Sequence, residues 1–194
     1  MNNNNLIRVS STLLAEDYTV EFEEMFSDDL FGPDVRADTP YPSVKVGDVL
    51  VEVYFSPDDG IASHLTELIQ SAKESIFFLA YSFTSDELAT AMLERAGNGV
   101  TVSGVFEEGQ YESNVGSEYD RFKAEGVEVR LDGNPRNMHH KVIIIDGNIV
   151  VVGSYNLSGS AEKRNDENVL IIHDAHIAAQ YLEEFERVFN DGHQ

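Results

Sequence analysis

Short apolar blocks alternate with amphipathic stretches through the middle of the chain. The apolar blocks have the length of buried strands and cover residues 50–55, 75–83, 100–106 and 127–131. Three stretches between them have helical periodicity: 61–73, a helix capped by Ser85 or Asp86 that ends near Ala96, and 117–125. Strands that alternate with helices predict parallel strand pairing, with the helices on the faces of the sheet.

The pattern changes after residue 131. Two apolar strands, 140–146 and 149–153, flank Asp146-Gly147, a dipeptide that favours a tight hairpin turn. A strand at 168–173 and a helix at 176–189 follow. The predicted fold class is therefore α/β, with a mixed, largely parallel sheet flanked by helices, preceded by an N-terminal tail and a linker.

The N-terminal tail repeats the C-terminal end of the chain. Residues 2–29 align without gaps on residues 165–192 at a constant offset of 163, and nine of the 28 pairs are identical. We interpret residues 1–29 as a remnant that resembles the end of a preceding repeat, followed by a proline-containing linker at 30–48 and one domain at 49–192. The alternative is that any two units of a strand followed by an amphipathic helix look alike.

Composition narrows the class of protein. The 194 residues carry a formal charge of −22 and include no cysteine, which excludes disulfides and thiolate chemistry. No apolar run approaches the roughly 20 residues that span a membrane, and the first twenty residues do not show the pattern expected of a signal peptide. Residues 121–164 contain seven basic and five acidic residues, a net +2, so the other residues carry −24. An anion would be received most readily in this window.

Polar side chains gather at the ends of the predicted hairpin. Side chains two residues apart on a strand share a face, so His139 should lie beside Lys141, and Ser154 beside Asn156. Gly153 would let the backbone approach a ligand. A phosphate could accept hydrogen bonds from Lys141, Ser154 and Asn156 while the imidazole attacks phosphorus or moves a proton. Each of these residues taken alone could also be an ordinary surface, strand-end or turn residue. The inference rests on the spacing of these residues taken together.

The spacing His139-x-Lys141-x4-Asp146-x6-Gly153-Ser154-x-Asn156 resembles the HKD motif of the phospholipase D superfamily. The resemblance covers about residues 46–192. It implies a metal-independent phosphodiesterase that forms a phosphohistidine and needs no cofactor. His139 would be the nucleophile or the matching general acid, and Lys141, Asn156 and Ser154 would bind the phosphate. Glu167 would orient the histidine, Asp146 would have a structural or orienting role within the catalytic set, and His140 has no assigned chemistry.

The family builds one active site from two motifs, and this chain contains only one. The resemblance therefore implies a second motif, supplied by a homodimer mate or by a missing repeat. Two functions of this class stay open: a phospholipase D-type lipid hydrolase, which we favour, and an endonuclease acting on DNA or RNA. A third hypothesis is a catalytically silent half that binds or dimerises within a tandem enzyme.

The acidic composition argues equally against tight nucleic-acid binding and against anionic membranes. Tyr81, Phe83 and Phe106 are predicted to be core residues in preference to a lipid slot. The compartment stays open: the chain is expected to be soluble and cytoplasmic if Met1 is the true start, with secretion as the alternative for a truncated chain.

Overall fold

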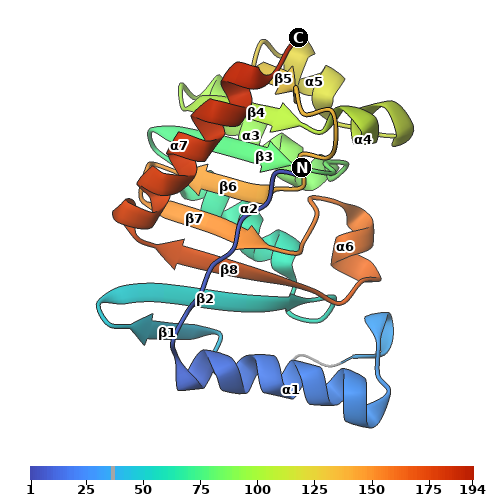
Figure 1. The fold of residues 1–194 in the computed structure, drawn as a ribbon, viewed down its shortest axis with the longest axis vertical. Helices are drawn as coiled ribbons and strands as arrows, with labels where there is room; N and C mark the ends of the chain where they lie inside the picture. The colour runs from blue at the N-terminus through green and yellow to red at the C-terminus, as the bar shows by residue number, and fades with distance from the viewer. Residues whose placement is uncertain (36–37) are drawn as a thin grey trace.

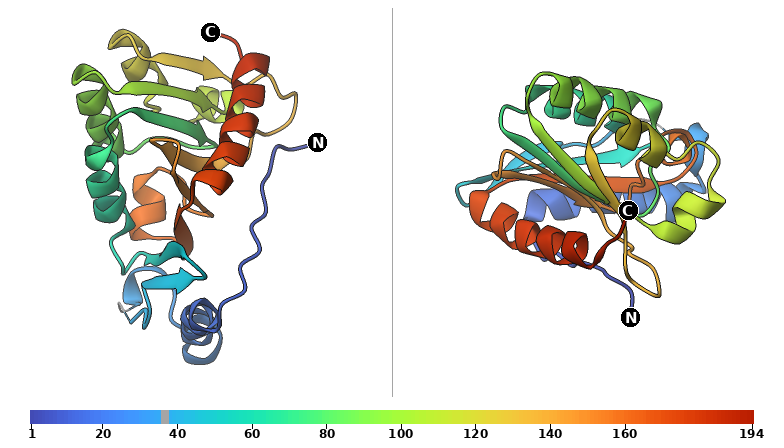
Figure 2. Two further views of the ribbon diagram at one scale, coloured as in Figure 1. Left: turned by 90° about the vertical axis from the view of Figure 1, so that its left-hand side faces the viewer. Right: turned by 90° about the horizontal axis from the view of Figure 1, so that it is seen from above.

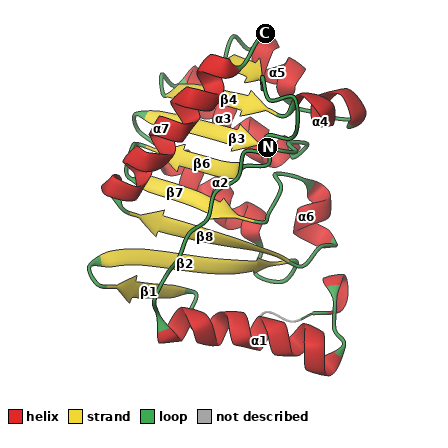
Figure 3. Cartoon of the chain, viewed as in Figure 1, coloured by secondary structure: helices red, strands yellow, loops and turns green. Residues whose placement is uncertain are grey.

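The computed structural model describes residues 1–35 and 38–194, which form one mixed sheet with helices on both faces (Figures 1 and 3). The strands are β1 (Ser43–Val46), β2 (Val49–Ser56), β3 (Ser75–Ala80), β4 (Thr101–Phe106), β5 (Glu128–Leu131), β6 (Lys141–Ile145), β7 (Ile149–Gly153) and β8 (Glu167–His173). The helices are α1 (Thr12–Asp28), α2 (Ile61–Ser71), α3 (Asp86–Gly97), α4 (Glu108–Ser113), α5 (Tyr119–Ala124), α6 (Gly159–Lys163) and α7 (Ala175–Asp191), with a short 3₁₀ helix at Gly32–Asp34.

The strands lie in the order β1-β2-β8-β7-β6-β3-β4-β5. The mixed α/β class is confirmed, but the prediction that the sheet is largely parallel is wrong. Only β3–β4 and β4–β5 are parallel, and the other five neighbouring pairs are antiparallel. The reason is that the hairpin β6–β7 and the last strand β8 insert between β2 and β3. A tight Asp-Gly turn joins only antiparallel strands.

Each face of the sheet has its own apolar core. Ile143 and Ile145 of β6 pack in one cluster with α2, α3 and α5, whereas Val142 and Ile144 pack in the other cluster with α7. Figure 2 shows α2 and α3 on one side of the sheet, and α7 with the N-terminal stretch on the other. Because both faces are covered, β6 is a continuous apolar run and not an alternating one.

Most of the predicted elements form within a few residues of their predicted limits. The N-cap of α3 is Ser85, whose hydroxyl accepts a hydrogen bond from the amide of Leu88. The strand predicted at 75–83 ends at Ala80 because the chain then leaves the sheet, and the amide of Tyr81 bonds the carbonyl of His140. The short helices α4 and α6 were not predicted. No helix in the described ranges is long and apolar enough to cross a membrane.

The N-terminal region contains structure that the sequence reading left out. The end of the predicted linker forms β1, which pairs with β2 at the edge of the sheet; the part of the linker at 36–37 lies outside the described residues. Residues 2–10 cross the molecule without forming a named strand, joined to it by an isolated bridge between Asn3 and Met138. Helix α1 then runs beside the β1–β2 edge (Figure 1). The assignment of residues 1–29 to a preceding repeat stays a prediction.

Candidate active site

A pocket of about 580 Å³ lies where β6 begins, β7 ends and β8 begins. These three ends meet because β6, β7 and β8 are consecutive antiparallel neighbours in the sheet. The lining includes five of the predicted site residues: His139, Lys141, Ser154, Asn156 and Glu167. The tertiary fold therefore brings together residues that are up to 28 positions apart in the chain.

His139 and Lys141 share one face, as their spacing predicted. The Lys141 ammonium lies 3.3 Å from Nε2 of His139 and also donates to the His139 carbonyl. Tyr81, at the end of β3, packs its ring 4.5 Å from the His139 ring, with the ammonium 4.6 Å from the tyrosine ring centre. The prediction that Tyr81 is a core residue is thus incomplete: Phe83 and Phe106 are buried, whereas Tyr81 contacts both candidate catalytic groups.

Burial and the nearby ammonium of Lys141 lower the pKa of His139, so the imidazole is neutral at neutral pH. Burial also lowers the pKa of Lys141, to about 8, although the Glu167 carboxylate acts in the opposite direction. A neutral imidazole can attack phosphorus, and a lysine that is still charged at pH 7 can bind a phosphoryl oxygen. Around pH 7 both groups therefore have the protonation states that the chemistry needs.

The end of β7 supplies a hydroxyl and an amide. Oγ of Ser154 accepts hydrogen bonds from the backbone amide and the side-chain amide of Asn168, at 3.1 and 3.2 Å. Oδ1 of Asn156 is buried and has no hydrogen-bond partner among the described residues. An unpaired buried acceptor is costly. The Nδ2 of the same side chain is the group that can donate to a phosphoryl oxygen.

Gly153 has a packing role that differs from the predicted one. A Cβ at this position would lie 2.0 Å from the carbonyl oxygen of Asn168 on β8. The same carbonyl accepts hydrogen bonds from the amides of Ser154 and Tyr155. Glycine is therefore required because the neighbouring strand comes close, and the expected approach of a ligand to this backbone is not needed to explain it.

Glu167 begins β8 and lies in the same pocket as the histidine. Its Oε1 accepts a hydrogen bond from Asn165 at 3.1 Å. In the described residues no hydrogen bond joins it to His139; its charge acts on Lys141 instead. The predicted contact from this acid to the histidine thus stays a prediction for the assembled site.

Asp146 is not part of the pocket. It lies at the far end of β6, about 15 Å from the pocket at about 3.3 Å per residue. Its carboxylate accepts hydrogen bonds from the backbone amides of Lys73, Glu74 and Ser75 at 2.8 to 3.1 Å. Burial raises the pKa of Asp146, but these amide bonds outweigh burial and the pKa is lowered overall. This geometry supports the structural role of the motif aspartate and gives it no contact with the reacting groups.

His140 points away from the site. Its side chain is buried, with Nδ1 3.0 Å from Oδ1 of Asn5 and Nε2 3.0 Å from a carboxylate oxygen of Glu184. Burial lowers its pKa, although the bond to Glu184 acts in the opposite direction. No chemistry is predicted for His140 from the sequence, and its position away from the site agrees with this.

The N-terminal segment contributes to the pocket, which the motif search did not anticipate. Asn4, Asn5 and Ile7 line it, and Tyr18 of α1 donates a hydrogen bond to Oδ1 of Asn168 at 3.0 Å. Tyr18 thereby holds the asparagine that in turn holds Ser154. The sequence feature that could have revealed this contribution is the repeat, because it aligns Asn5 with Asn168 and Tyr18 with Tyr181.

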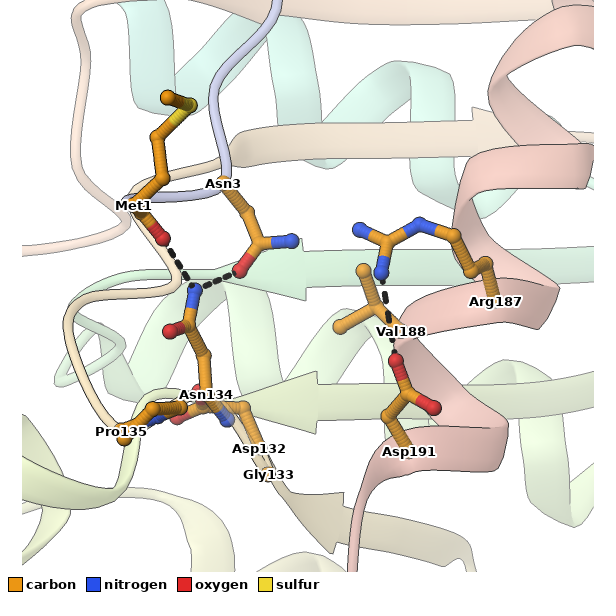
Figure 4. A pocket seen from close by; sticks show the side chains of 9 residues that line it. All are labelled: Met1, Asn3, Asp132, Gly133, Asn134, Pro135, Arg187, Val188 and Asp191. Carbon is orange, nitrogen blue, oxygen red and sulfur yellow. Dashed lines mark hydrogen bonds and ion pairs between the residues drawn. The ribbon is translucent and has the colours of Figure 1, made fainter.

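A second pocket of about 420 Å³ lies between the 132–135 loop and α7 (Figure 4). It contains none of the predicted site residues. Asn134 donates hydrogen bonds to the carbonyl of Met1 and to Asn3, and Arg187 pairs with Asp191 at 3.2 Å. The contacts of Asn134 hold the start of the chain against the domain. Across the described part of the chain, no three His, Asp or Glu side chains converge as metal ligands would.

The chain is similar to known proteins of one family. The family described as "Cardiolipin synthase, PLD-like domain" matches residues 65–189. The chain is 32% identical over 151 residues to a phospholipase D of Rickettsia bellii, covering 75% of each protein. It is 35% identical to a mitochondrial cardiolipin hydrolase of Xenopus tropicalis, covering 69% of this chain and 63% of that protein. Among solved structures, the phospholipase D family member Nuc from Salmonella typhimurium superposes with a TM-score of 0.68 and 32% identity, covering 74% of this chain and 96% of Nuc.

Proposed function

Because this chain belongs to the phospholipase D superfamily of phosphodiester hydrolases, we propose that it cleaves a phosphodiester through a phosphohistidine formed on His139. The observation that carries this proposal is the pocket itself. It holds an imidazole and an ammonium 3.3 Å apart, with a serine and an asparagine opposite, all at the meeting point of three strand ends. No metal takes part in the proposed reaction.

In the first step, Nε2 of His139 attacks phosphorus and the bond from phosphorus to the leaving oxygen breaks. The product is a phosphohistidine, and the leaving alcohol takes a proton from a second histidine. In the second step, that histidine removes a proton from water, and the resulting oxygen attacks the phosphohistidine. The bond from phosphorus to Nε2 breaks, which releases a phosphomonoester, regenerates the neutral imidazole of His139 and returns the second histidine to its protonated form.

The remaining residues bind and orient. Lys141 and Asn156 would hold the phosphoryl oxygens as charge develops on them, and Ser154 would assist from the position that Asn168 gives it. Glu167 would hold a histidine in the correct tautomer. The second histidine has no candidate in this chain, so we propose that a second motif completes the site, supplied by a dimer mate or by another repeat.

A phospholipid is the preferred substrate. The relatives named phospholipase D and mitochondrial cardiolipin hydrolase support this choice. An endonuclease of the same superfamily, acting on DNA or RNA, is the alternative; the net charge of −22 disfavours nucleic acid and anionic membranes equally and does not decide between them. A domain that only binds or dimerises is the third alternative; the intact pocket argues against it.

The test uses bis(p-nitrophenyl) phosphate in excess EDTA, with sedimentation in the same buffer. From the form of the protein that contains two motifs, a dimer or a chain with both repeats, we expect cleavage that resists EDTA and falls about 10³-fold or more in His139→Ala. His176→Ala is the matched control, because this histidine is exposed on α7 outside the pocket. An unchanged rate in His139→Ala would remove the histidine from the mechanism, and cleavage by a strict monomer would remove the need for a second motif.

A second assay separates the substrate classes. Phosphatidylcholine vesicles and single-stranded DNA are offered in parallel at high salt, where electrostatic repulsion is screened. Release of the headgroup from vesicles, lost in His139→Ala, is the expected result. Turnover of DNA alone would favour the endonuclease, and turnover of neither would favour the silent domain.

A further inference from the structure

Two helices of the fold match residue for residue at the offset of the sequence repeat. Helix α1 (Thr12–Asp28) and helix α7 (Ala175–Asp191) have 17 residues each, and both pairs of limits differ by 163. Their N-caps also correspond. Ser11 accepts a hydrogen bond from the amide of Leu14, as Asp174 does from the amide of Ile177. The repeat is therefore present in the structure as well as in the sequence.

The two copies of this unit contact each other reciprocally. Asn5 donates to the hydroxyl of Tyr181, and Tyr18 donates to the side-chain oxygen of Asn168, both at 3.0 Å. Since Asn5 corresponds to Asn168 and Tyr18 to Tyr181, the same pair forms twice with its members exchanged. This exchange is the signature of a two-fold interface. The lining of the active-site pocket shows it again, with Ile7 and its counterpart Leu170 both present.

The apolar face of α1 lacks the cover that α7 has. On α7, Phe185 is 5% exposed and packs on Phe77 of the sheet, with Phe189 beside it at 5.3 Å. The rings of their counterparts on α1, Phe22 and Phe26, lie 5.2 Å apart but are 55% and 77% exposed. The ring pair that packs α7 against a sheet is therefore present on α1 without a sheet.

The opposite side of α1 faces the domain and is acidic. Asp17 and Glu24 are buried there, and each has one carboxylate oxygen without a hydrogen-bond partner among the described residues. Burial raises the pKa of both carboxyls. An isolated amphipathic helix would place its phenylalanines inward and its carboxylates outward. In α1 the phenylalanines face outward instead, and the side that faces the domain combines these carboxylates with buried Leu14 and with Tyr18, which packs on Phe55.

We infer that the exposed face of α1 is covered by the sheet of a second phospholipase D-like domain, for which residues 2–29 supply the final strand and helix. The partner is a domain without an α7 of its own. In a second copy of this chain that place is already filled, so self-association is the less suitable occupant. The reciprocal contacts set an approximate two-fold axis beside the pocket, and this axis would place the partner's motif opposite His139. This inference rests on the proposed function and identifies the source of its second motif.

The first experiment tests whether the single chain needs the exposed face of α1 for its own stability. Phe22→Asp with Phe26→Asp should leave the melting temperature unchanged, because both rings lie largely in solvent. The matched variant Phe185→Asp should lower it strongly, because the corresponding ring is buried. A comparable loss in both proteins would show that α1 packs through its phenylalanines and would overturn the inference. A dimer of the single chain that Phe22→Asp dissociates would make a second copy the occupant and would also overturn it.

The second experiment supplies the partner. Residues 38–164 are fused directly before Asn2 of the full chain, so that residues 2–29 follow Arg164 as residues 165–192 do in the native order. Because the chain has no cysteine, Phe26→Cys gives a single labelling site whose reaction with a thiol reagent reports exposure. Val115→Cys, fully exposed in the α4–α5 loop and introduced only in the full-length copy, is the control.

We expect the thiol of Phe26→Cys to react at least 10-fold more slowly in the tandem chain than in the single chain, and that of Val115→Cys to react equally in both. Equal rates for Phe26→Cys in the two chains would refute the inference, and this includes the case in which the added half does not fold. The labelling does not depend on catalysis. Protection without diesterase activity would therefore retain the interface and refute the proposed function, and activity without protection would do the opposite.

Discussion

Replacing Asp146 with asparagine separates a structural from a catalytic role for the motif aspartate. The carboxylate accepts hydrogen bonds from three backbone amides, those of Lys73, Glu74 and Ser75. Asparagine keeps the shape and tolerates the left-handed backbone of this residue, whose φ is 51°. It removes the charge and turns one acceptor into a donor that faces the same amides.

The expected cost follows from the number of amides that lose their partner. A hydrogen bond to a charged group contributes about 1.5–3 kcal/mol. The amides of Lys73 and Glu74 are exposed and can bind water, so only the partly buried bond to Ser75 should count in full. We therefore expect a loss of about 2 kcal/mol, which for a chain of this size lowers the melting temperature by about 4–8 °C.

The effect should also depend on pH in one direction. The pKa of Asp146 is lowered in the folded protein, so its contribution is present above the ordinary pKa of 3.8 and is lost as the pH falls through the folded value. The difference in melting temperature between wild type and Asp146→Asn should be constant near neutrality and shrink below about pH 4. Asp48→Asn, in the exposed β1–β2 turn, is the control and should change nothing.

Activity is the deciding measurement. Because Asp146 lies at the far end of β6 from the pocket, kcat for bis(p-nitrophenyl) phosphate at a temperature where both proteins are folded should change by less than about threefold. A stable variant with a 100-fold lower kcat would refute this reasoning and show that the aspartate takes part in catalysis.

Three further predictions follow from the same structure. The pH profile of kcat/KM should rise as His139 loses its proton below about pH 6.5 and fall at higher pH as the second histidine and, near pH 8, Lys141 lose the protons that the reaction needs; a flat profile would contradict these assignments. Gly153→Ala should lower the melting temperature, because its Cβ would lie 2.0 Å from a backbone oxygen of β8, and wild-type stability would show that the strands can separate there. Burial, with Asp58 and other nearby carboxylates, raises the pKa of Glu21 to about 8 in the folded protein. The fold is therefore more stable while Glu21 is protonated, and this stability is lost as the pH rises toward 8. The melting temperature of Glu21→Gln should fall less between pH 5 and 8.5 than that of wild type.

Local sequence patterns were sufficient for the elements of the central domain. The hairpin around Asp146-Gly147, the cap at Ser85 and the helix near the C-terminus each depend on neighbours within a few positions, and all three formed as predicted. The motif spacing also placed His139 beside Lys141, because alternation along a strand is a local rule. Its resemblance to the phospholipase D superfamily is confirmed by the comparisons.

Contacts between distant segments could not be read from such patterns. The order of strands was not predictable, since nothing local to β8 says that it inserts beside β2. The short strand β1 was taken for linker because four residues between prolines and glycine show no period. Tyr81 was assigned to the core, and only the pairing of β3 with β6 shows that its ring reaches the histidine.

The sequence by itself determined the candidate residues: one histidine, one lysine and their partners at the motif spacing, and a similarity between the two ends of the chain at an offset of 163. The tertiary structure alone decided which of these residues meet. It left Asp146 at the far end of its strand, explained Gly153 by the approach of β8, and brought the two copies of the repeat into reciprocal contact. The physical reason is that spacing along the chain fixes side-chain direction within one element, whereas contacts between elements depend on how their apolar faces pack.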